Sequence, residues 1–277
     1  MNRTKAKNWP EVLEYAQSIR DGRKIACDEL KQAVERFFHD LDNPDYWMDH
    51  KAPEFCIGVI EKTLCHQQGE RLDGTPLRGK PFLLEPFHKF IIYNLVGFKL
   101  AGSERVRFHE ALIYIPRKNI KTSFAASLAW ALSLLYRRSG SKMYIASAAL
   151  MQSMESYNFL AYNVRRMGED AKDGGSVRII DNHNEHSLSA DLGDGSLYIR
   201  ALAANPDSQD SLNANIAICD EIHAFKQPKQ YNLFKEAMKA YTNKLLIGIS
   251  TAGDNEQAFL GQRLKYCRKV LDGTVTD

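Results

Sequence analysis

Two pairs of adjacent residues in this sequence, Lys121-Thr122 and Asp220-Glu221, carry side chains suited to hydrolysis of a nucleoside triphosphate. A lysine ammonium can reach the terminal phosphates, and a threonine hydroxyl can hold Mg²⁺. The aspartate would hold the same ion, mostly through water, and the glutamate would orient and activate the attacking water. This chemistry requires the two pairs to meet in space, although they lie far apart in the sequence.

The first pair stands where a strand would pass into a helix. An apolar, β-branched run at 111–115 is followed by Pro116, a short polar loop and an Ala/Leu-rich helical run that ends at Tyr136. A phosphate-binding loop requires this order, because the helix N-terminus offers free N–H groups and a partial positive charge. The residues expected to contact the nucleotide there are Pro116, Arg117, Lys118, Asn119, Ile120, Lys121, Thr122 and Ser123.

This loop departs from the usual phosphate-binding pattern, which has a glycine at its first position and another just before the lysine. Ile115 and Ile120 hold these two positions. Because a β-branched residue rarely adopts a positive φ, we expect the chain to turn elsewhere, through Asn119. The alternative is that Lys121-Thr122 merely opens a surface helix.

The second pair ends an apolar run at 216–219, as expected at the carboxyl edge of an open parallel sheet. A further apolar run at 245–249 ends in Ser250-Thr251, whose hydroxyls can sense the γ-phosphate from a strand beside the acidic one. The alternatives are an acidic turn at the edge of a sheet and a simple strand-to-loop cap. The upstream Lys-Thr unit favours the catalytic interpretation of the acidic pair, whereas both interpretations of Ser250-Thr251 stay open.

An aromatic-rich turn at 81–90 leads into a helical run shortly before the phosphate loop. Many nucleic-acid motor ATPases bind the adenine at such a place, and they usually hydrogen-bond the base with a glutamine. This chain offers Phe87 and His88, which we predict to contact the base. The alternative is that Phe87 belongs to the core and His88 caps the helix at the surface.

Strand and helix signals alternate from residue 111 onward, with a strand at 143–147 and a helix at 150–166, and this alternation indicates a mostly parallel sheet. Short alternating runs at 176–202 indicate hairpin-like strands instead. With the two reactive pairs, the pattern predicts an α/β fold: a P-loop NTPase of the RecA-like (ASCE) type, with helices on both faces of the sheet.

The N-terminal part of the chain is helical in pattern. Two amphipathic runs lie between residues 9 and 41, and a third helix is expected at 52–67. A polar segment with Gly and Pro at 69–80 favours a boundary there. We therefore expect an N-terminal helical subdomain at 1–70 and the P-loop ATPase domain at 71–277.

Composition restricts the class of protein further. The chain has 277 residues, 44% of them apolar, which suffices for one large α/β domain with an appendage, and its net charge of +3 permits nucleic-acid binding without requiring it. Five widely spaced cysteines without a C-x-x-C pair argue against a disulfide framework or a zinc site. We expect a soluble, intracellular protein without a signal peptide or membrane contact.

In combination and in this order, these segments resemble the ATPase portion of the large terminase subunit of tailed double-stranded-DNA bacteriophages. The resemblance covers residues 15–253 and is specific as a set, although no single piece is. It rests on Ala26-Cys27, Arg36 to Asp40, Leu84-Glu85-Pro86-Phe87, Phe108 to Ala111, Pro116-Arg117-Lys118-Asn119, Lys121-Thr122, Asp220-Glu221-Ile222-His223-Ala224 and Ser250-Thr251-Ala252-Gly253.

The resemblance implies an ATP-hydrolysing motor that uses ATP and Mg²⁺ to translocate double-stranded DNA into a procapsid. Thr122 and Asp220 would hold the metal, Glu221 would activate water, Arg117 would act near the γ-phosphate, and Ser250-Thr251 would form the coupling motif. Such motors act as homo-oligomeric rings that need an arginine from the neighbouring subunit, for which Arg200 is the candidate. The implied partners are the portal and the small terminase subunit, in the cytoplasm of the infected host cell.

Three positions depart from the family's pattern, since its members usually carry Gly, Gln and Gly where this chain has Ile120, His88 and Ser211. Full-length members continue into an RNase-H-like nuclease. After the coupling motif this chain has only Asp254, Glu256, Asp272 and Asp277 as acidic residues, so we expect no nuclease activity from it.

Two other functions remain open at this stage. A helicase-like, nucleic-acid-dependent ATPase fits the acidic motif at 220–223, but this length leaves no room for a second RecA-like domain. A DNA- or procapsid-binding module with a decayed nucleotide site fits Ile120, but the retained Lys121, Thr122, Asp220 and Glu221 argue against decay.

Overall fold

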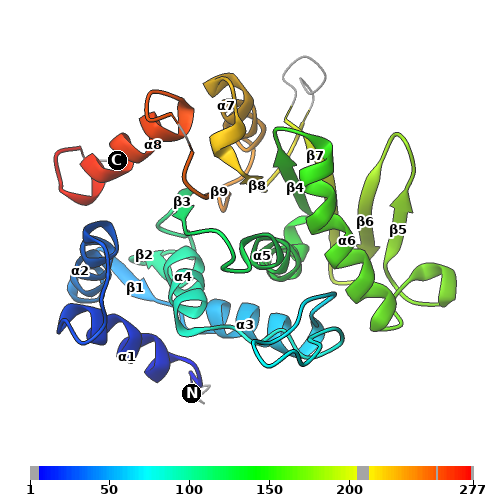
Figure 1. The fold of residues 1–277 in the computed structure, drawn as a ribbon, viewed down its shortest axis with the longest axis horizontal. Coiled ribbons are helices and arrows are strands. Elements are labelled where there is room, and N and C mark those ends of the chain that lie inside the picture. Colours follow the sequence, from blue (N-terminus) through cyan, green and yellow to red (C-terminus); the bar gives the residue numbers. More distant parts are fainter. Residues whose placement is uncertain (1–5, 205–211, 254, 276–277) are drawn as a thin grey trace.

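A seven-stranded sheet organises the chain in the computed structural model, which describes residues 6–204, 212–253 and 255–275 (Figure 1). The strand order is β3-β9-β8-β4-β7-β6-β5. The bounds are β3 Glu110–Tyr114, β4 Ser141–Ser147, β5 Arg178–Asp181, β6 His186–Asp191, β7 Ser196–Ala203, β8 Ile216–Asp220 and β9 Leu245–Ser250.

The first five strands in this order pair in parallel, and the two pairings that follow, β7 with β6 and β6 with β5, are antiparallel. The predicted mostly parallel sheet is confirmed, and β3 and β8, which precede the two reactive pairs, lie in the same sheet. The hairpin-like pattern at 176–202 corresponds to β5, β6 and β7. The last of these strands also pairs in parallel with β4, so the hairpin extends the parallel part of the sheet.

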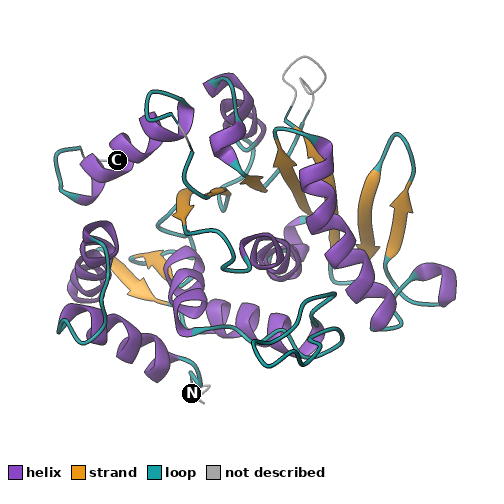
Figure 2. Ribbon diagram, viewed as in Figure 1, coloured by secondary structure: helices purple, strands orange, loops and turns teal. Residues whose placement is uncertain are grey.

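Helices cover both faces of the sheet (Figure 2). On one face α5 packs against β4, β7 and β8, and α6 packs against β4 and β7; α7 and α8 lie on the other side. The helix bounds are α1 Trp9–Arg20, α2 Asp28–Asp42, α3 Lys51–Thr63, α4 Pro86–Val96, α5 Lys121–Leu135, α6 Leu150–Arg166, α7 Pro228–Ala237 and α8 Phe259–Leu271.

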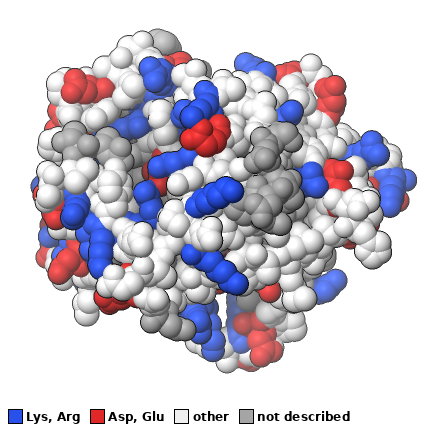
Figure 3. All heavy atoms as spheres, turned by 90° about the horizontal axis from the view of Figure 1, so that it is seen from above, with Lys and Arg blue, Asp and Glu red and all other residues white. Residues whose placement is uncertain are grey.

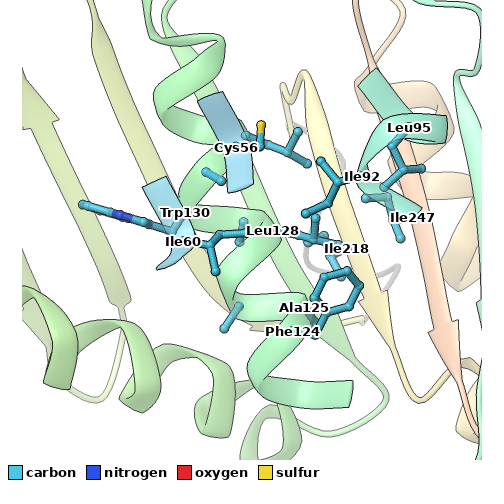
Figure 4. Close-up of a cluster of buried hydrophobic side chains, with 14 of the residues drawn as sticks. Cys56, Ile60, Ile92, Leu95, Phe124, Ala125, Leu128, Trp130, Ile218 and Ile247 are labelled. Carbon is cyan, nitrogen blue, oxygen red and sulfur yellow. The ribbon is translucent and has the colours of Figure 1, made fainter. Parts of the chain in front are cut away.

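Alternation along the central strands builds a separate core on each face, since successive side chains of a strand point to opposite sides. In β8, Ile216 and Ile218 face α5, whereas Ala217 and Cys219 join the core beneath α7 and α8. Figure 4 shows Ile218 and Ile247 against side chains of α5 and of the N-terminal helices. Burial on both sides explains why these strands are apolar throughout.

The N-terminal helices form an outer layer. The helix α3 packs on α5 rather than on the sheet, α4 packs on α3, and α1 packs on α4. A two-stranded antiparallel sheet, β1 (Tyr46–Met48) with β2 (Phe98–Leu100), ties this layer to the chain after α4. The boundary between 1–70 and 71–277 stays a prediction. Across the described part of the chain, no helix is long and apolar enough to cross a membrane.

Candidate nucleotide-binding site

The two reactive pairs meet because of the strand order. The strands β3, β9 and β8 are parallel neighbours, so their carboxyl ends lie at the same edge of the sheet. The first leads into the loop 115–120, the second ends at Ser250, and the third ends at Asp220. The Ile115 N–H donates to the Ser250 carbonyl at 3.2 Å and extends the pairing into the loop.

An open pocket of about 240 Å³ lies between these strand ends and the start of α5. It is lined by Arg117, Lys118, Ile120, Lys121, Thr122, Ser123, Glu221 and Thr251. All eight are among the residues predicted from the sequence to act at the nucleotide. Pro116, Asn119, Ser250, Phe87 and His88 lie outside this lining.

A larger recess of about 430 Å³ lies elsewhere, along α6, and is lined by Gln67, Asn158, Tyr162, Arg165 and Arg166. Its arginines are engaged: Arg165 pairs with Asp170 at 3.5 Å, and Arg166 donates to the Gly79 carbonyl at 3.1 Å. The smaller pocket at the strand ends holds the acidic and hydroxyl side chains that nucleotide chemistry needs.

Lys121 joins the two reactive pairs directly. Its ammonium contacts Asp220 Oδ1 and lies 3.0 Å from Glu221 Oε1. The Lys121 and Asp220 side chains are only 7% and 2% exposed, so little water screens their attraction. Burial raises the pKa of Asp220, and the charge and hydrogen bond of Lys121 oppose that rise.

Glu221 is held on both of its carboxylate oxygens. Oε1 faces Lys121, Oε2 lies 3.0 Å from His223 Nδ1, and Thr251 Oγ1 donates to Oε2 at 3.5 Å. The Glu221 backbone has φ +53°, a left-handed conformation that is costly for a residue with a Cβ. Its N–H donates to Asp220 Oδ1 at 2.8 Å, which fixes this turn.

The phosphate loop turns differently from the expectation. Lys118 has φ +66° and Ile120 has φ +48°, so the predicted turn through Asn119 in place of Ile120 is wrong. The Asn119 amide instead donates to the carbonyls of Pro116 and Arg117 at 3.1 and 3.3 Å. The Ile120 side chain is 41% exposed, but exposure does not relieve the local clash of its Cβ with the backbone, so the left-handed conformation is strained.

The aromatic turn at 81–90 contacts the first turn of α5. His88 is fully buried, its ring centroid lies 4.4 Å from that of Phe124 in the first turn of α5, and its Nδ1 accepts the Glu85 N–H at 3.2 Å. The half-buried Phe87 ring covers His88 with a centroid distance of 3.8 Å. Of the two, Phe87 is accessible to a ligand in this conformation, and His88 supports it from behind.

Arg200 does not line the pocket. It lies on β7, opposite Tyr144 of β4 and Ser187 of β6, and donates to the Asn184 carbonyl at 3.1 Å. Its predicted action on a neighbouring subunit's nucleotide stays a prediction. Ser211 and Asp254 lie outside the described residues.

His223 is the site residue that the sequence analysis missed. It lies in a single 3-10 turn, η4 (Ile222–Ala224), that follows Glu221. In the sequence, His223 is only part of the acidic motif at 220–224 and has no assigned role, because its contact with Ser250 on another strand is not visible there.

Fold and site together define a P-loop NTPase: a mostly parallel sheet covered by helices, with a Lys-Thr helix N-terminus facing an acidic strand end. The family model for the ATPase domain of the terminase large subunit matches residues 86–269. This chain therefore belongs to the terminase large subunit ATPase family.

Solved structures resemble this fold. The large terminase of bacteriophage HK97 is 23% identical, with a TM-score of 0.60, and the match covers 79% of this chain. This chain spans 42% of the length of that protein. The large terminase ATPase domain of Thermus phage P74-26 is 16% identical, with a TM-score of 0.41 over 60% of this chain and 70% of that one. No curated protein sequence gives a significant match.

Replacing Ile120 tests the strain in the loop. The left-handed backbone costs a residue with a Cβ about 1–2 kcal/mol, whereas the unfolded-state entropy of glycine costs about 0.5–1 kcal/mol. We expect Ile120→Gly to leave the free energy of unfolding unchanged or to raise it slightly, with nucleotide affinity at least retained. Ile120→Ala, the matched control, keeps the Cβ and the strain. Urea unfolding in which the Gly variant is less stable than the Ala variant would contradict this.

Acid titration tests the burial of His88. Burial lowers the pKa of His88 to about 4, while an unfolded histidine ionises near 6.5. At a pH between these two pKa values, His88 binds more protons in the unfolded state than in the folded state. The folded state is therefore stabilised above the unfolded pKa, and this stability is lost as the pH falls towards the pKa of the folded state. The difference amounts to about 2 kcal/mol between pH 7.5 and pH 5.

His88→Gln keeps an acceptor for the Glu85 N–H and removes this titration, so we expect it to lose about 2 kcal/mol less stability over that range. The control is His183→Gln, since His183 is exposed on the hairpin. Urea unfolding at both pH values measures the effect. Equal losses in the parent and both variants would show that His88 is protonated as easily in the folded as in the unfolded chain.

Proposed function

We propose that this chain hydrolyses ATP as the ATPase of a viral motor that translocates double-stranded DNA into a procapsid. One observation carries the proposal: Lys121, at the N-terminus of α5, faces Asp220 and Glu221 at the end of β8. This arrangement juxtaposes a phosphate-binding cation and helix N-terminus with the carboxylates that hold a metal and activate water.

The triphosphate would occupy the pocket at the strand ends. Its β- and γ-phosphates would accept hydrogen bonds from Lys121 and from the N–H groups at the start of α5, and Arg117 would approach the γ-phosphate. The lining residues Arg117 and Lys118 are exposed, and within the described residues neither forms an ion pair. They are therefore available to attract an anion.

The oxygen ligands present suit Mg²⁺. The Thr122 hydroxyl and the Asp220 carboxylate would hold the ion together with phosphate oxygens and water. Among the described residues no three His, Cys, Asp or Glu side chains form a metal cluster. When bound, the ion neutralises phosphate charge. Glu221 would accept a proton from the attacking water.

The adenine would lie against Phe87. This ring is half-buried above His88, beside the first turn of α5, and an aromatic face can stack on a base of any identity. His88 would stiffen this platform, and its Nε2 would have to become accessible before it could hydrogen-bond the base. That nitrogen is buried without a hydrogen-bond partner.

The proposed DNA partner is supported by the charge of one face. Figure 3 shows several Lys and Arg side chains across the middle of the face seen from above in Figure 1. Lys226 and Lys229, at the start of α7, are exposed. Such side chains suit sequence-independent contact with phosphate backbones.

The assembly proposed from the family is a homo-oligomeric ring in the host cytoplasm, with the portal and the small terminase subunit as partners. In that ring Arg200 would act on the nucleotide of a neighbouring subunit. We further propose that residues 1–70 form a helical subdomain and that 71–277 form the ATPase domain.

Two substitutions test the assignment of roles. We expect Glu221→Gln to abolish ATP hydrolysis and to retain nucleotide binding, because only the proton acceptor is removed. Lys121→Ala should weaken binding by about 1.5–3 kcal/mol, because a charge-assisted phosphate contact is lost. Binding would be measured by titration calorimetry, and turnover by phosphate release with and without duplex DNA.

The matched control is Glu185→Gln, which neutralises an ordered carboxylate that accepts from Ser187 and Tyr198 on the hairpin. It should keep the parent's turnover. ATP hydrolysis by Glu221→Gln at the parent's rate would refute the assignment of Glu221 as the base.

We also propose that this chain does not cut DNA. RNase-H-type cleavage needs several carboxylates that converge on two metal ions. After the coupling motif, Glu256 lies in an exposed turn and Asp272 follows α8, while Asp254 and Asp277 lie outside the described residues. Plasmid incubated with the protein, Mn²⁺ and ATP should stay supercoiled. Nicking that is lost in Glu256→Gln but kept in Glu221→Gln would contradict this.

A further inference from the structure

His223 connects the acidic motif to the end of the neighbouring strand. Its Nδ1 lies 3.0 Å from Glu221 Oε2 and 3.1 Å from Ser250 Oγ, and its backbone N–H donates to the same hydroxyl at 3.2 Å. Gly253 closes the other side, since a Cβ there would lie 3.0 Å from the Cβ of His223. The ring is thus held by β9 and by the turn that follows β8.

The hydrogen bonds around Ser250 determine which ring nitrogen carries the proton. The Ser250 hydroxyl has one hydrogen, which it donates to the Thr251 carbonyl at 2.9 Å. Its oxygen must therefore accept from His223, and the carboxylate of Glu221 can only accept. Both contacts require a hydrogen on Nδ1, shared between Ser250 Oγ and Glu221 Oε2.

We propose that His223 is a positioning residue for the reaction, which holds the Glu221 carboxylate in the orientation needed to activate water and couples it to β9. This inference rests on the proposed ATP hydrolysis. It assigns His223 no contact with the nucleotide, because the residue acts through Glu221 and does not line the pocket.

The need for such a residue follows from the two partners of Glu221. Lys121 holds Oε1, yet the same ammonium is required by the phosphates, so binding of a triphosphate draws this partner away. His223 holds Oε2 and has no competing ligand in the pocket. The carboxylate therefore keeps its orientation while Lys121 changes partners.

The contact with Ser250 adds a path from the sheet to the base. Ser250 ends β9, which lies between β3 and β8, and its hydroxyl meets His223 through both ring and backbone. A shift of this strand end moves the imidazole, and the imidazole moves the carboxylate. Strand movement thereby changes the rate of hydrolysis.

Three variants of His223 separate a positioning role from a structural one. Asparagine places an amide N–H near the position of Nδ1, glutamine places it nearer Nε2, and alanine removes it. We expect His223→Ala to lower kcat by about 10–100-fold, since a small misplacement of a catalytic group has costs of this order. The KM for ATP should stay within about twofold, because the phosphate contacts are intact.

His223→Asn should recover most of the lost kcat, and His223→Gln should not. The matched control is His186→Ala, which removes a histidine with a similar Nδ1 contact, 2.8 Å from Asp181, on the hairpin away from the site. It should keep the parent's kcat. Parent-like kcat in His223→Ala, or equal activity of the Ala and Asn variants, would overturn the proposal.

A second measurement does not depend on turnover. ¹⁵N NMR of the imidazole in the parent protein should show a hydrogen on Nδ1. The Nε2-protonated tautomer would overturn the proposed linkage. If the parent showed the expected tautomer but hydrolysed no ATP, the proposed function would fail while the contact between His223 and Glu221 stood.

Discussion

The structure depends on a cluster of one cation and two carboxylates, in which Lys121 and Asp220 are buried and Glu221 is partly exposed to the pocket. Removing these groups from water costs several kcal/mol for each ion, and this cost is offset only where opposite charges meet in good geometry. The fold supplies that geometry by ending β8 opposite the N-terminus of α5. Such a cluster contributes little net stability, but it holds charged groups ready for an anion that competes for the lysine.

The sheet order explains how the cluster forms from distant segments. One strand, β9, lies between β3, which leads to Lys121, and β8, which ends in Asp220. That strand brings Ser250 and Thr251 between the two reactive pairs. Left-handed backbone at Ile120 and Glu221 then aims both pairs into one pocket. Backbone strain of this kind persists where the surrounding structure fixes the conformation, and it is common at functional sites.

Much of the fold could be predicted from residue patterns. The helix at 150–166 is observed with these bounds, and the apolar runs before Lys121 and Asp220 are the predicted parallel strands. These signals are strong because burial on both faces demands a continuous apolar strand. The short strands β1 and β2 and the helix α7 gave no comparable signal, because three-residue strands are too short to show a pattern and α7 buries only Tyr231 and Phe234.

Three residues of the site could not be described correctly from the sequence. Local propensity opposed a positive φ at Ile120, but the surrounding loop, with the hydrogen bonds of Asn119, holds the residue in this strained conformation. The complete burial of His88 follows from the packing of α4 against α5, a long-range contact that local pattern does not encode. His223 gains its role from Ser250, on a different strand.

A crystal structure of this chain with Mg²⁺ and a non-hydrolysable ATP analogue would test the central claim most directly, namely that phosphates and carboxylates compete for Lys121. We expect the lysine ammonium within hydrogen-bonding distance of a phosphate oxygen and withdrawn from Glu221 Oε1, with Glu221 Oε2 still beside His223. An analogue bound away from the start of α5, with Lys121 still on both carboxylates, would contradict the claim.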